Sequence, residues 1–195
     1  MKKIILASTS PRRAALLKQL GIPFRSVDSH YEETIDRKLT PDKNARTISF
    51  CKALAVAKKY PNCLIIAADT LVAFEGKILG KPYTVPRALK MLKSLSGHTH
   101  SVITGLTLLD TGTGKVLTKT ATTKIRVRKL SNAEIRAYVK SGETLDKAGA
   151  YAVQGLGISI VEKISGDYYN VVGLPLHELV AGLKEFGINV LDSRK

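Results

Sequence analysis

The chain of 195 residues is 44% hydrophobic and carries 31 Lys and Arg against 16 Asp and Glu, a formal charge of +15. Its length and ordinary Gly and Pro content indicate a globular protein of one domain or two closely joined lobes, and no low-complexity or arginine-rich tail is present. The charge predicts an anionic partner, which is a nucleic acid backbone, an acidic membrane surface or a small phosphorylated ligand.

Membrane insertion and secretion are both disfavoured by the apolar pattern. No stretch reaches the roughly 18 apolar residues of a membrane span, and the apolar run after Lys2 and Lys3 is too short for a signal peptide. The two cysteines, Cys51 and Cys63, have no metal-ligand spacing around them, and we expect reduced thiols in the core. These features predict a soluble, cytoplasmic protein.

The N-terminal stretch predicts a strand, a tight loop and a helix start. Residues 4–7 are apolar, and residues 8–13 (STSPRR) follow them directly, with Ser10 suited to the N-cap position. The first turn of a helix offers free N–H groups and a partial positive charge, to which Arg12 and Arg13 add guanidinium groups. Such a corner suits a phosphate. The alternative is a capped amphipathic helix whose arginines face solvent.

The next elements lead to a carboxylate at the end of a buried strand. After a short strand at residues 23–27, a helix begins at Pro41 and carries Lys52, and the continuous apolar run 64–68 predicts a buried strand. Asp69 follows at the carboxyl end, where ligands bind in open α/β sheets and where an unpaired charge is costly. Asp69 is therefore the strongest single candidate for chemistry, the alternative being a cap of the following turn.

The second half of the chain alternates strands and helices without an internal repeat. We expect a hairpin (residues 71–74 with 78–79), a helix (84–95) and a long antiparallel pair (101–109 with 117–127). A capped helix (131–141) and a shorter antiparallel pair (158–164 with 168–172) follow. A last helix (175–186) and a last strand (189–191) end the series. The polar, Gly-rich residues 146–155 are expected to form a loop with several side chains aimed at one place.

Two histidines and two tyrosines each allow both a structural and a functional interpretation. His98 and His100 have no third metal ligand in range, so we expect surface or strand-end histidines. Tyr168 and Tyr169 could stack on a base, but aromatic residues on a strand are more often part of the core, which is our expectation.

Together, the charged and polar candidates have the residue types that a site cleaving a phosphoanhydride needs. They are the corner at residues 8–13, the carboxylates Glu33 and Asp69, the lysines Lys52 and Lys81, and the polar loop around Gln154. Fixed cations meet the charge of a triphosphate, and Mg²⁺ takes a few carboxylate oxygens, here those of Glu33 and Asp69, plus phosphates and water. One carboxylate could also orient or deprotonate the attacking water. No Walker-type or dinucleotide glycine loop is present, which disfavours those enzyme classes.

Several ordered motifs give the chain a specific resemblance to a known family. They lie at residues 6–13, 68–70, 79–82, 146–151, 154–155, 166–168 and 173–175, and they cover nearly the whole chain. With these motifs the chain resembles the Maf nucleotide pyrophosphatases. The resemblance implies an α/β fold like that of inosine triphosphate pyrophosphatases, in which helices flank a long twisted mixed β-sheet. It also implies a single domain over residues 1–195, with two lobes and a central active-site cleft.

The resemblance further implies a hydrolase that cleaves a nucleoside triphosphate to the monophosphate and pyrophosphate with a divalent cation, Mg²⁺ or Mn²⁺, in a house-cleaning role. Carried over by position, Asp69 is the catalytic residue and a metal ligand with Glu33, and the phosphate-binding residues are Ser8, Arg13, Lys52 and Lys81. Three positions, Arg12, Thr70 and Gln154, match the branch that acts on dTTP and UTP, whereas the 7-methyl-GTP branch tends to carry Trp, Gln and Glu there.

Two alternatives stay open beside this hypothesis. One is a pyrophosphatase for another nucleotide, such as a modified pyrimidine or 7-methyl-GTP. The other is a nucleic-acid-binding or division-regulating protein, which the charge permits but the spread of the basic residues disfavours. The expected partner is a small-molecule nucleoside triphosphate, with a homodimer as an option and no membrane partner.

Overall fold

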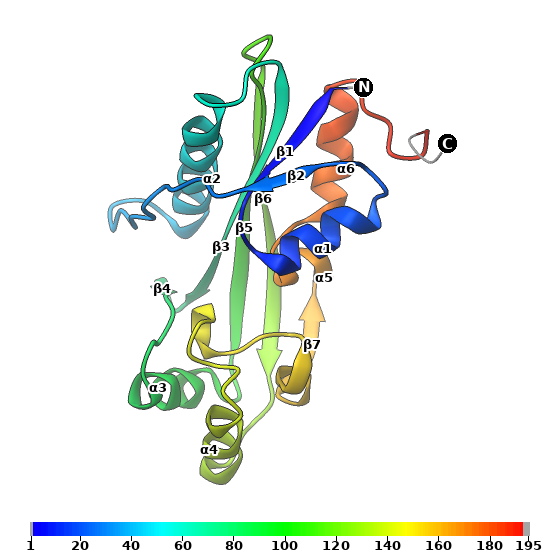
Figure 1. Ribbon diagram of the computed structural model, residues 1–195. Coiled ribbons are helices and arrows are strands. Elements are labelled where there is room, and N and C mark those ends of the chain that lie inside the picture. The colour runs from blue at the N-terminus through cyan, green and yellow to red at the C-terminus, as the bar shows by residue number, and fades with distance from the viewer. Residues whose placement is uncertain (1, 193–195) are drawn as a thin grey trace. The chain divides into compact units, whose positions relative to one another are not determined.

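The computed structural model describes residues 2–192, and in this range it has one mixed sheet flanked by helices (Figure 1). The strands are β1 (Lys3–Ala7), β2 (Arg25–Val27), β3 (Cys63–Phe74), β4 (Lys77–Leu79), β5 (Thr99–Asp110), β6 (Val116–Val127) and β7 (Val161–Ser165). The α-helices are α1 (Pro11–Gln19), α2 (Pro41–Ala57), α3 (Val85–Leu95), α4 (Asn132–Lys140), α5 (Tyr168–Val172) and α6 (Leu176–Glu185). Two 3₁₀ helices are η1 (Ala148–Ala150) and η2 (Gly155–Ser159). No helix in residues 2–192 has both the length and the apolar character that a membrane crossing requires.

The sheet has the strand order β2-β1-β3-β5-β6-β7, with β4 paired to β3. Parallel pairs, such as β1 with β2 and with β3, occur beside antiparallel ones, such as β6 with β7. The predicted α/β class with a mixed sheet and flanking helices is therefore confirmed.

The chain divides into two compact units, and the division passes through β3, β5 and β6. Unit 1 contains the residues up to Thr70, the segment Thr104–Ala121 and the residues from Gly173 onward. Unit 2 contains Leu71–Ile103 and Thr122–Val172. The single domain with a central cleft stays a prediction.

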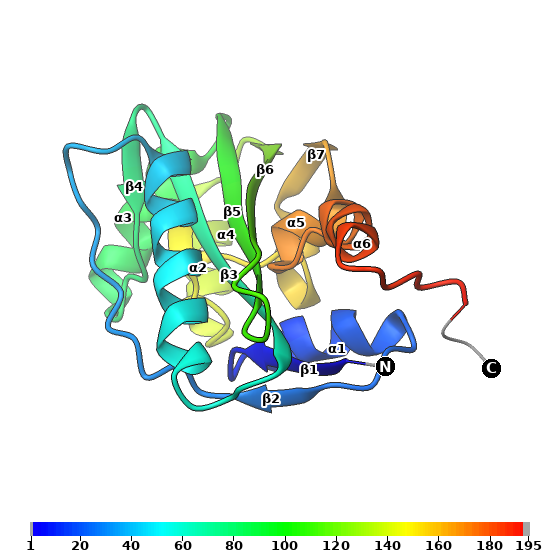
Figure 2. The same cartoon turned by 90° about the horizontal axis from the view of Figure 1, so that it is seen from above.

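In unit 1, helices cover both faces of the parallel strands. Figure 2 shows α2 on one face, and α1 and α6 on the opposite face. Parallel strands of one sheet need crossover connections, which α1 supplies from β1 to β2 and α2 supplies from β2, past β1, to β3. A strand covered on both faces is apolar throughout, and residues 64–68 of β3 are indeed 0% exposed. The predicted buried strand is confirmed.

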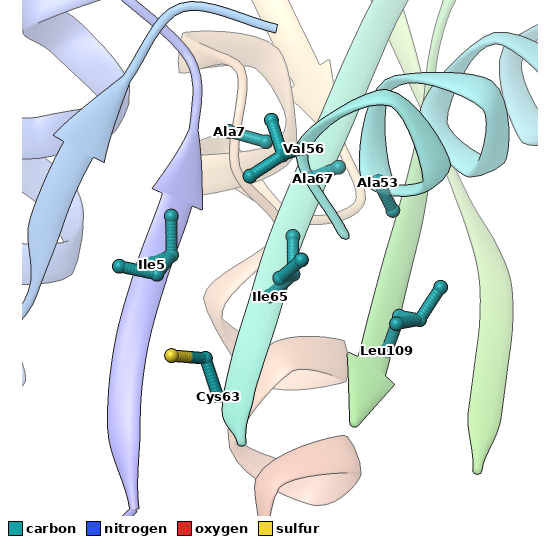
Figure 3. Close-up of a cluster of buried hydrophobic side chains, with 8 residues drawn as sticks. All are labelled: Ile5, Ala7, Ala53, Val56, Cys63, Ile65, Ala67 and Leu109. Atoms are coloured by element: carbon teal, nitrogen blue, oxygen red, sulfur yellow. The ribbon is translucent and has the colours of Figure 1, made fainter. Parts of the chain in front are cut away.

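Alternate residues of the strands form the core beneath α2. Figure 3 shows this cluster of Ile5, Ala7, Ala53, Val56, Cys63, Ile65, Ala67 and Leu109. Side chains two apart on a strand point to the same face, and those three apart on a helix lie on one side, so β1, β3 and α2 meet along one apolar seam. Cys63 is a free thiol in this core, as predicted. Cys51 is also free but only half-buried, so its expected place in the core is wrong.

The predicted helix starts have the expected positions but differ in their side-chain caps. Ser10 Oγ accepts a hydrogen bond from the Arg13 backbone N–H at 3.4 Å, and Ser131 forms the full capping box with Glu134. The side chains of Thr40 and Thr84 make no capping hydrogen bond, although each precedes its helix.

The expected strand at residues 168–172 is wrong, because this segment is the short helix α5. Asp167 Oδ1 accepts a hydrogen bond from the Tyr169 backbone N–H at 2.8 Å, and Gly166 before it has φ of 126°. This local bond turns the chain into a helix, as side chains of this type do at helix starts. Tyr168 and Tyr169 are 42% and 41% exposed, so the expectation of core aromatics is wrong as well.

Three other strand boundaries differ from expectation. The proposed strand at 189–191 is wrong: Asn189 Oδ1 accepts from the Leu191 backbone N–H at 3.3 Å, and residues 190–192 form a turn. The strand expected at residues 158–164 begins later, as β7, because η2 occupies the start of that range. The strand expected at 23–27 is limited to β2.

Asp110, the last residue of β5, ties the N-terminus to the turn before β6. Its buried carboxylate accepts hydrogen bonds from Lys2 Nζ and from the Gly112 and Thr113 backbone N–H groups, the latter two at 2.9 and 3.4 Å. The bond from Lys2 is the largest cause, and with the turn bonds it lowers the pKa of Asp110 from 3.8 to about 2, although burial acts in the opposite direction.

This lowered pKa predicts a pH dependence of folding stability. A carboxyl whose pKa is lower in the folded state stabilises the protein above its unfolded pKa, and the stabilisation is lost as the pH falls to the folded pKa. We expect the difference in melting temperature between the native chain and Asp110→Asn to shrink as the pH falls from about 4 to about 2. Thermal unfolding at closely spaced pH values measures it. A difference that stays constant across this window would contradict the assignment.

Candidate active site

Arg13 is the centre of a hydrogen-bond network in unit 1. It lies in the first turn of α1, and Nε donates to the Gly173 carbonyl oxygen at 2.8 Å. Nη1 donates to Ser8 Oγ at 3.3 Å and Nη2 donates to Thr70 Oγ1 at 3.2 Å. A guanidinium has five N–H donors, so one on each terminal nitrogen has no acceptor among the described residues. Arg13 is thus held in place with two donors left for an anion.

The acceptors of Arg13 are themselves fixed. Ser8 follows β1, is 8% exposed, and its Oγ also accepts from the Ser10 backbone N–H at 3.2 Å. Because Ser8 Oγ accepts both of these bonds, its own O–H stays available as a donor. Thr70 Oγ1 lies 2.9 Å from the hydroxyl of the fully buried Thr104. The predicted phosphate-binding residues Ser8 and Arg13 are therefore held in fixed positions.

Lys52 forms the second cluster, between two carboxylates. Its Nζ lies 2.6 Å from Asp69 Oδ1 and 2.5 Å from Glu33 Oε1. The side chains of Lys52 and Asp69 are 7% and 5% exposed, whereas that of Glu33 is 53% exposed. Lys52 lies four residues after the buried Ile48, on the inward face of α2. A lysine on such a face needs charged partners, and the two carboxylates supply them.

Asp69 lies inside β3 and not at its carboxyl end as expected, since β3 continues to Phe74. The pairing of β1 with β3 ends at Leu6 and Ile66, so Asp69 lies three residues beyond the last pair. At that point β1 has already turned toward α1. Open α/β sheets bind ligands in the crevice beyond the carboxyl ends of their strands. Asp69 has such a position relative to β1, because it lies beyond the carboxyl end of that strand.

The two oxygens of Asp69 have different environments. Oδ1 binds Lys52, whereas Oδ2 is buried and has no hydrogen-bond partner among the described residues. Burial raises the pKa of Asp69 most strongly and Glu33 raises it further, while the charges of Lys52 and Arg13 lower it. An unpartnered buried oxygen is costly, so this atom is positioned to accept a proton or a cation.

The charge of Arg13 couples the two clusters of unit 1. Burial lowers the pKa of Arg13, the carboxylates of Asp69 and Glu33 raise it, and neighbouring Arg12 lowers it. Asp69 and Thr70 are adjacent in β3, so the same strand contributes to both clusters. Arg12 is exposed and takes no part in the network around Arg13.

Unit 2 contains the two remaining residues that the sequence predicts for the site. Lys81 and Gln154 are both exposed. The Gly149 backbone N–H donates to the Gly80 carbonyl at 3.2 Å, and the Tyr83 backbone N–H donates to the Leu145 carbonyl at 3.1 Å. These bonds join the segment around Lys81 to the start of the loop that carries Gln154.

The two histidines of unit 2 have the positions expected of surface and strand-end residues. His98 is exposed, and His100 is the second residue of β5. His100 is also buried, and its Nε2 lies 2.7 Å from Tyr151 Oη. Burial lowers the pKa of His100 to about 4.

The carboxylates of unit 1 fit a hard divalent cation. Among residues 2–192 there is no group of three or more His, Cys, Asp or Glu that could hold a metal by itself. Mg²⁺ usually takes one or two protein carboxylates and completes its shell with substrate phosphates and water. Asp69, whose Oδ2 has no hydrogen-bond partner in the described part of the chain, and the half-exposed Glu33 are a donor set of this kind.

Two residues of the network had no role in the sequence prediction. Gly173 accepts the Arg13 Nε bond, and its φ is 122°, a conformation that favours glycine. Thr104 is a hydroxyl at a fully buried position in β5, bound to Thr70. In the sequence, Gly173 is visible only as a glycine inside a family motif, and Thr104 only as a threonine inside an apolar strand. Neither pattern specifies a hydrogen-bond partner.

A family model and the named relatives match nearly the whole chain. The family model described as "Maf-like protein" matches residues 3–186. A protein of Caldicellulosiruptor saccharolyticus named "dTTP/UTP pyrophosphatase" is 45% identical over an alignment of 195 positions, which covers 98% of this chain and 98% of that protein. A protein of the same name from Methanosarcina barkeri is 49% identical over 193 residues, again 98% of each chain. The structure of the Staphylococcus aureus Ham1 protein gives a TM-score of 0.49 at 15% identity, over 82% of this chain and 80% of that one.

Proposed function

Because this chain belongs to the Maf-like protein family, we propose that it hydrolyses dTTP and UTP to the nucleoside monophosphate and pyrophosphate. Relatives that share 45% and 49% of their residues over 98% of this chain carry the name dTTP/UTP pyrophosphatase. The observation that carries the proposal is the buried Lys52 between Asp69 and Glu33, in the same unit as the fixed Arg13.

The first step is the binding of the phosphates. Arg13 offers one N–H from each terminal nitrogen, held in direction by its bonds to Ser8, Thr70 and Gly173. The N-terminal end of α1 adds a partial positive charge at the same place. Preorganised donors of this kind stabilise charge without a reorganisation cost. Lys81, on its exposed loop in unit 2, is proposed as a further phosphate-binding residue.

The second step is the attack of water on the α-phosphorus. Asp69 Oδ2 accepts a proton from the water, the new bond forms between the water oxygen and phosphorus, and the bond to the α–β bridging oxygen breaks. Pyrophosphate leaves with that electron pair. Burial, the largest effect, and Glu33 raise the pKa of Asp69, whereas the charges of Lys52 and Arg13 lower this pKa and so favour the ionised form. General-base assistance of this kind typically contributes about 10²- to 10⁴-fold in rate.

Asp69 and Glu33 are proposed to hold a divalent cation, Mg²⁺ or Mn²⁺. When bound, such an ion neutralises phosphate charge and supports the leaving group. Lys52 binds Oδ1 of Asp69 and Oε1 of Glu33 and so holds both carboxylates in place.

Preference for a pyrimidine base is proposed to depend on Gln154, Arg12 and Thr70. A neutral amide can both donate to and accept from the imide edge of uracil or thymine, whereas a carboxylate suits a positively charged methylated purine. Thr70 accepts a bond from Arg13, so its contribution acts through the position of that guanidinium.

A substrate panel tests the proposal. The purified protein with Mg²⁺ or Mn²⁺ is given each common triphosphate, modified pyrimidine triphosphates and 7-methyl-GTP, and pyrophosphate and phosphate are measured separately. We expect pyrophosphate from dTTP and UTP. Release of phosphate alone would contradict cleavage between the α- and β-phosphates. The absence of turnover with every nucleotide would contradict the enzyme and favour the nucleic-acid-binding alternative.

A further inference from the structure

The segment around Gln154 has little regular structure to hold it. Gln154 lies between η1 and η2 with an extended backbone, φ −110° and ψ 168°, and it is exposed. A side chain that reads a base must start from a fixed backbone, because an error of about 1 Å in position is costly. Side chains from elsewhere in unit 2 must therefore supply the support.

Two side chains near the end of α4 hold the backbone on both sides of Gln154. The Ala152 backbone N–H, two residues before it, donates to Tyr138 Oη at 3.3 Å. The Leu156 backbone N–H, two residues after it, donates to Glu143 Oε1 at 3.2 Å. Tyr138 lies on α4, and Glu143 follows the end of that helix. The two bonds together fix the five-residue segment at both ends.

Glycines allow the segment to approach these side chains closely. A Cβ on Gly155 would lie 2.7 Å from Glu143 Oε1 and 3.0 Å from Oε2. A Cβ on Gly157 would lie 1.8 Å from the Ala152 carbonyl oxygen and 2.7 Å from Tyr138 Oη. No L side chain fits at either distance without a shift of the backbone or of its partner. The chain next to Gln154 is thus packed directly on the Glu143 carboxylate.

Glu143 is an unusual choice for a purely structural contact. Its Oε2 is buried and has no hydrogen-bond partner among residues 2–192, which costs free energy that an apolar side chain would not. What the carboxylate does provide is a charged acceptor for the Leu156 N–H, and hydrogen bonds to charged groups are roughly twice as strong as neutral ones. Glu143 thus makes this segment more rigid but lowers the free energy of unfolding of the protein.

We propose that Glu143 is a positioning residue for recognition of the nucleotide base, acting through the Leu156 N–H and the backbone of Gly155 on the side chain of Gln154. The inference rests on the proposed function, in which Gln154 contacts the pyrimidine. It assigns Glu143 an effect on substrate binding and base preference, and none on the cleavage step.

The test compares Glu143→Ala with Glu143→Gln in steady-state turnover of UTP and dTTP. We expect Glu143→Ala to raise KM about tenfold, as for loss of one hydrogen bond to a charged group, with kcat within about twofold. Glu143→Gln keeps an oxygen acceptor for Leu156 and is expected to restore KM to within about twofold. Glu162→Ala, an exposed glutamate of β7, is the matched control and should leave both constants unchanged. An unchanged KM in Glu143→Ala would overturn the proposal.

A double-mutant cycle separates positioning from a general loss of structure. In a Gln154→Ala background, Glu143→Ala is expected to add less than a twofold change in KM. The reason is that Glu143 acts by positioning the Gln154 side-chain amide, which this background lacks. Equal tenfold effects in both backgrounds would overturn the proposal. Should Glu143→Ala lose its cooperative thermal transition, Glu143→Asp replaces it, since its carboxylate is one methylene shorter.

Hydrogen exchange gives a readout that does not depend on turnover. In Glu143→Ala we expect faster exchange of the peptide that contains the Leu156 amide, with unchanged exchange in α3. Unaltered exchange at Leu156 would overturn the inference even if the enzyme is active. Conversely, a native protein without activity on any nucleotide would overturn the proposed function, while faster exchange would still show that Glu143 holds the segment.

Discussion

Replacing Asp69 by Asn is expected to lower pyrophosphate release from dTTP and UTP by roughly 10²- to 10⁴-fold, the range that a positioned general base contributes. The amide keeps the shape of the carboxylate but cannot accept a proton at neutral pH. Asp69 Oδ2 is buried, has no hydrogen-bond partner within residues 2–192 and is the proton acceptor of the proposed mechanism, so the substitution removes its function directly.

The fold of Asp69→Asn is expected to survive. Lys52 keeps its bond to Glu33 Oε1 at 2.5 Å, so its charge is not left unpaired when Asp69 is neutralised. The variant should therefore show one cooperative thermal transition together with its loss of activity. This combination distinguishes a chemical defect from unfolding.

The matched control for this experiment is Asp28→Asn. The Asp28 side chain is 50% exposed, and its Oδ1 accepts from the His30 backbone N–H, a bond that an amide oxygen can also accept. We expect its turnover to stay at the native value. Activity of Asp69→Asn within a few-fold of this control would contradict the role of Asp69 and direct attention to Glu33 as the acceptor.

Replacing Gly105 by Ala is expected to destabilise the protein by about 3 kcal/mol or more, or to prevent folding. A Cβ at this position of β5 would lie 2.1 Å from the Ala45 carbonyl oxygen, 2.3 Å from its carbon and 2.7 Å from the Arg46 backbone nitrogen. All three are backbone atoms of α2, which cannot turn aside as a flexible side chain can. The helix that carries Lys52 would have to move away from the sheet.

Denaturant unfolding of the Gly105→Ala and Gly80→Ala variants tests this expectation. A Cβ on Gly80 would meet nothing within 4 Å, so this second variant changes the same residue type without a clash. We expect its midpoint to stay near the native one. Equal midpoints for the two variants would show that α2 and β5 are not in the close contact described.

Local features of the chain were predictable because their causes are local. The cap at Ser10, the apolar run at residues 64–68 and the capping box at Ser131 depend on neighbours within a few residues, and the structure confirms each. Where a local bond was overlooked, the prediction failed. The hydrogen bond from the Tyr169 backbone N–H to Asp167 turned an expected strand into α5.

The sequence by itself determined the α/β class, the residue types of the site and the family, since periodicity and ordered motifs are properties of a linear chain. Only the tertiary structure decided which of these residues meet. Lys52 reaches Glu33 and Asp69 across 19 and 17 residues, and Arg13 reaches Gly173 across 160. No local pattern specifies such contacts, because they arise when helices pack on a sheet and desolvated charges must find partners.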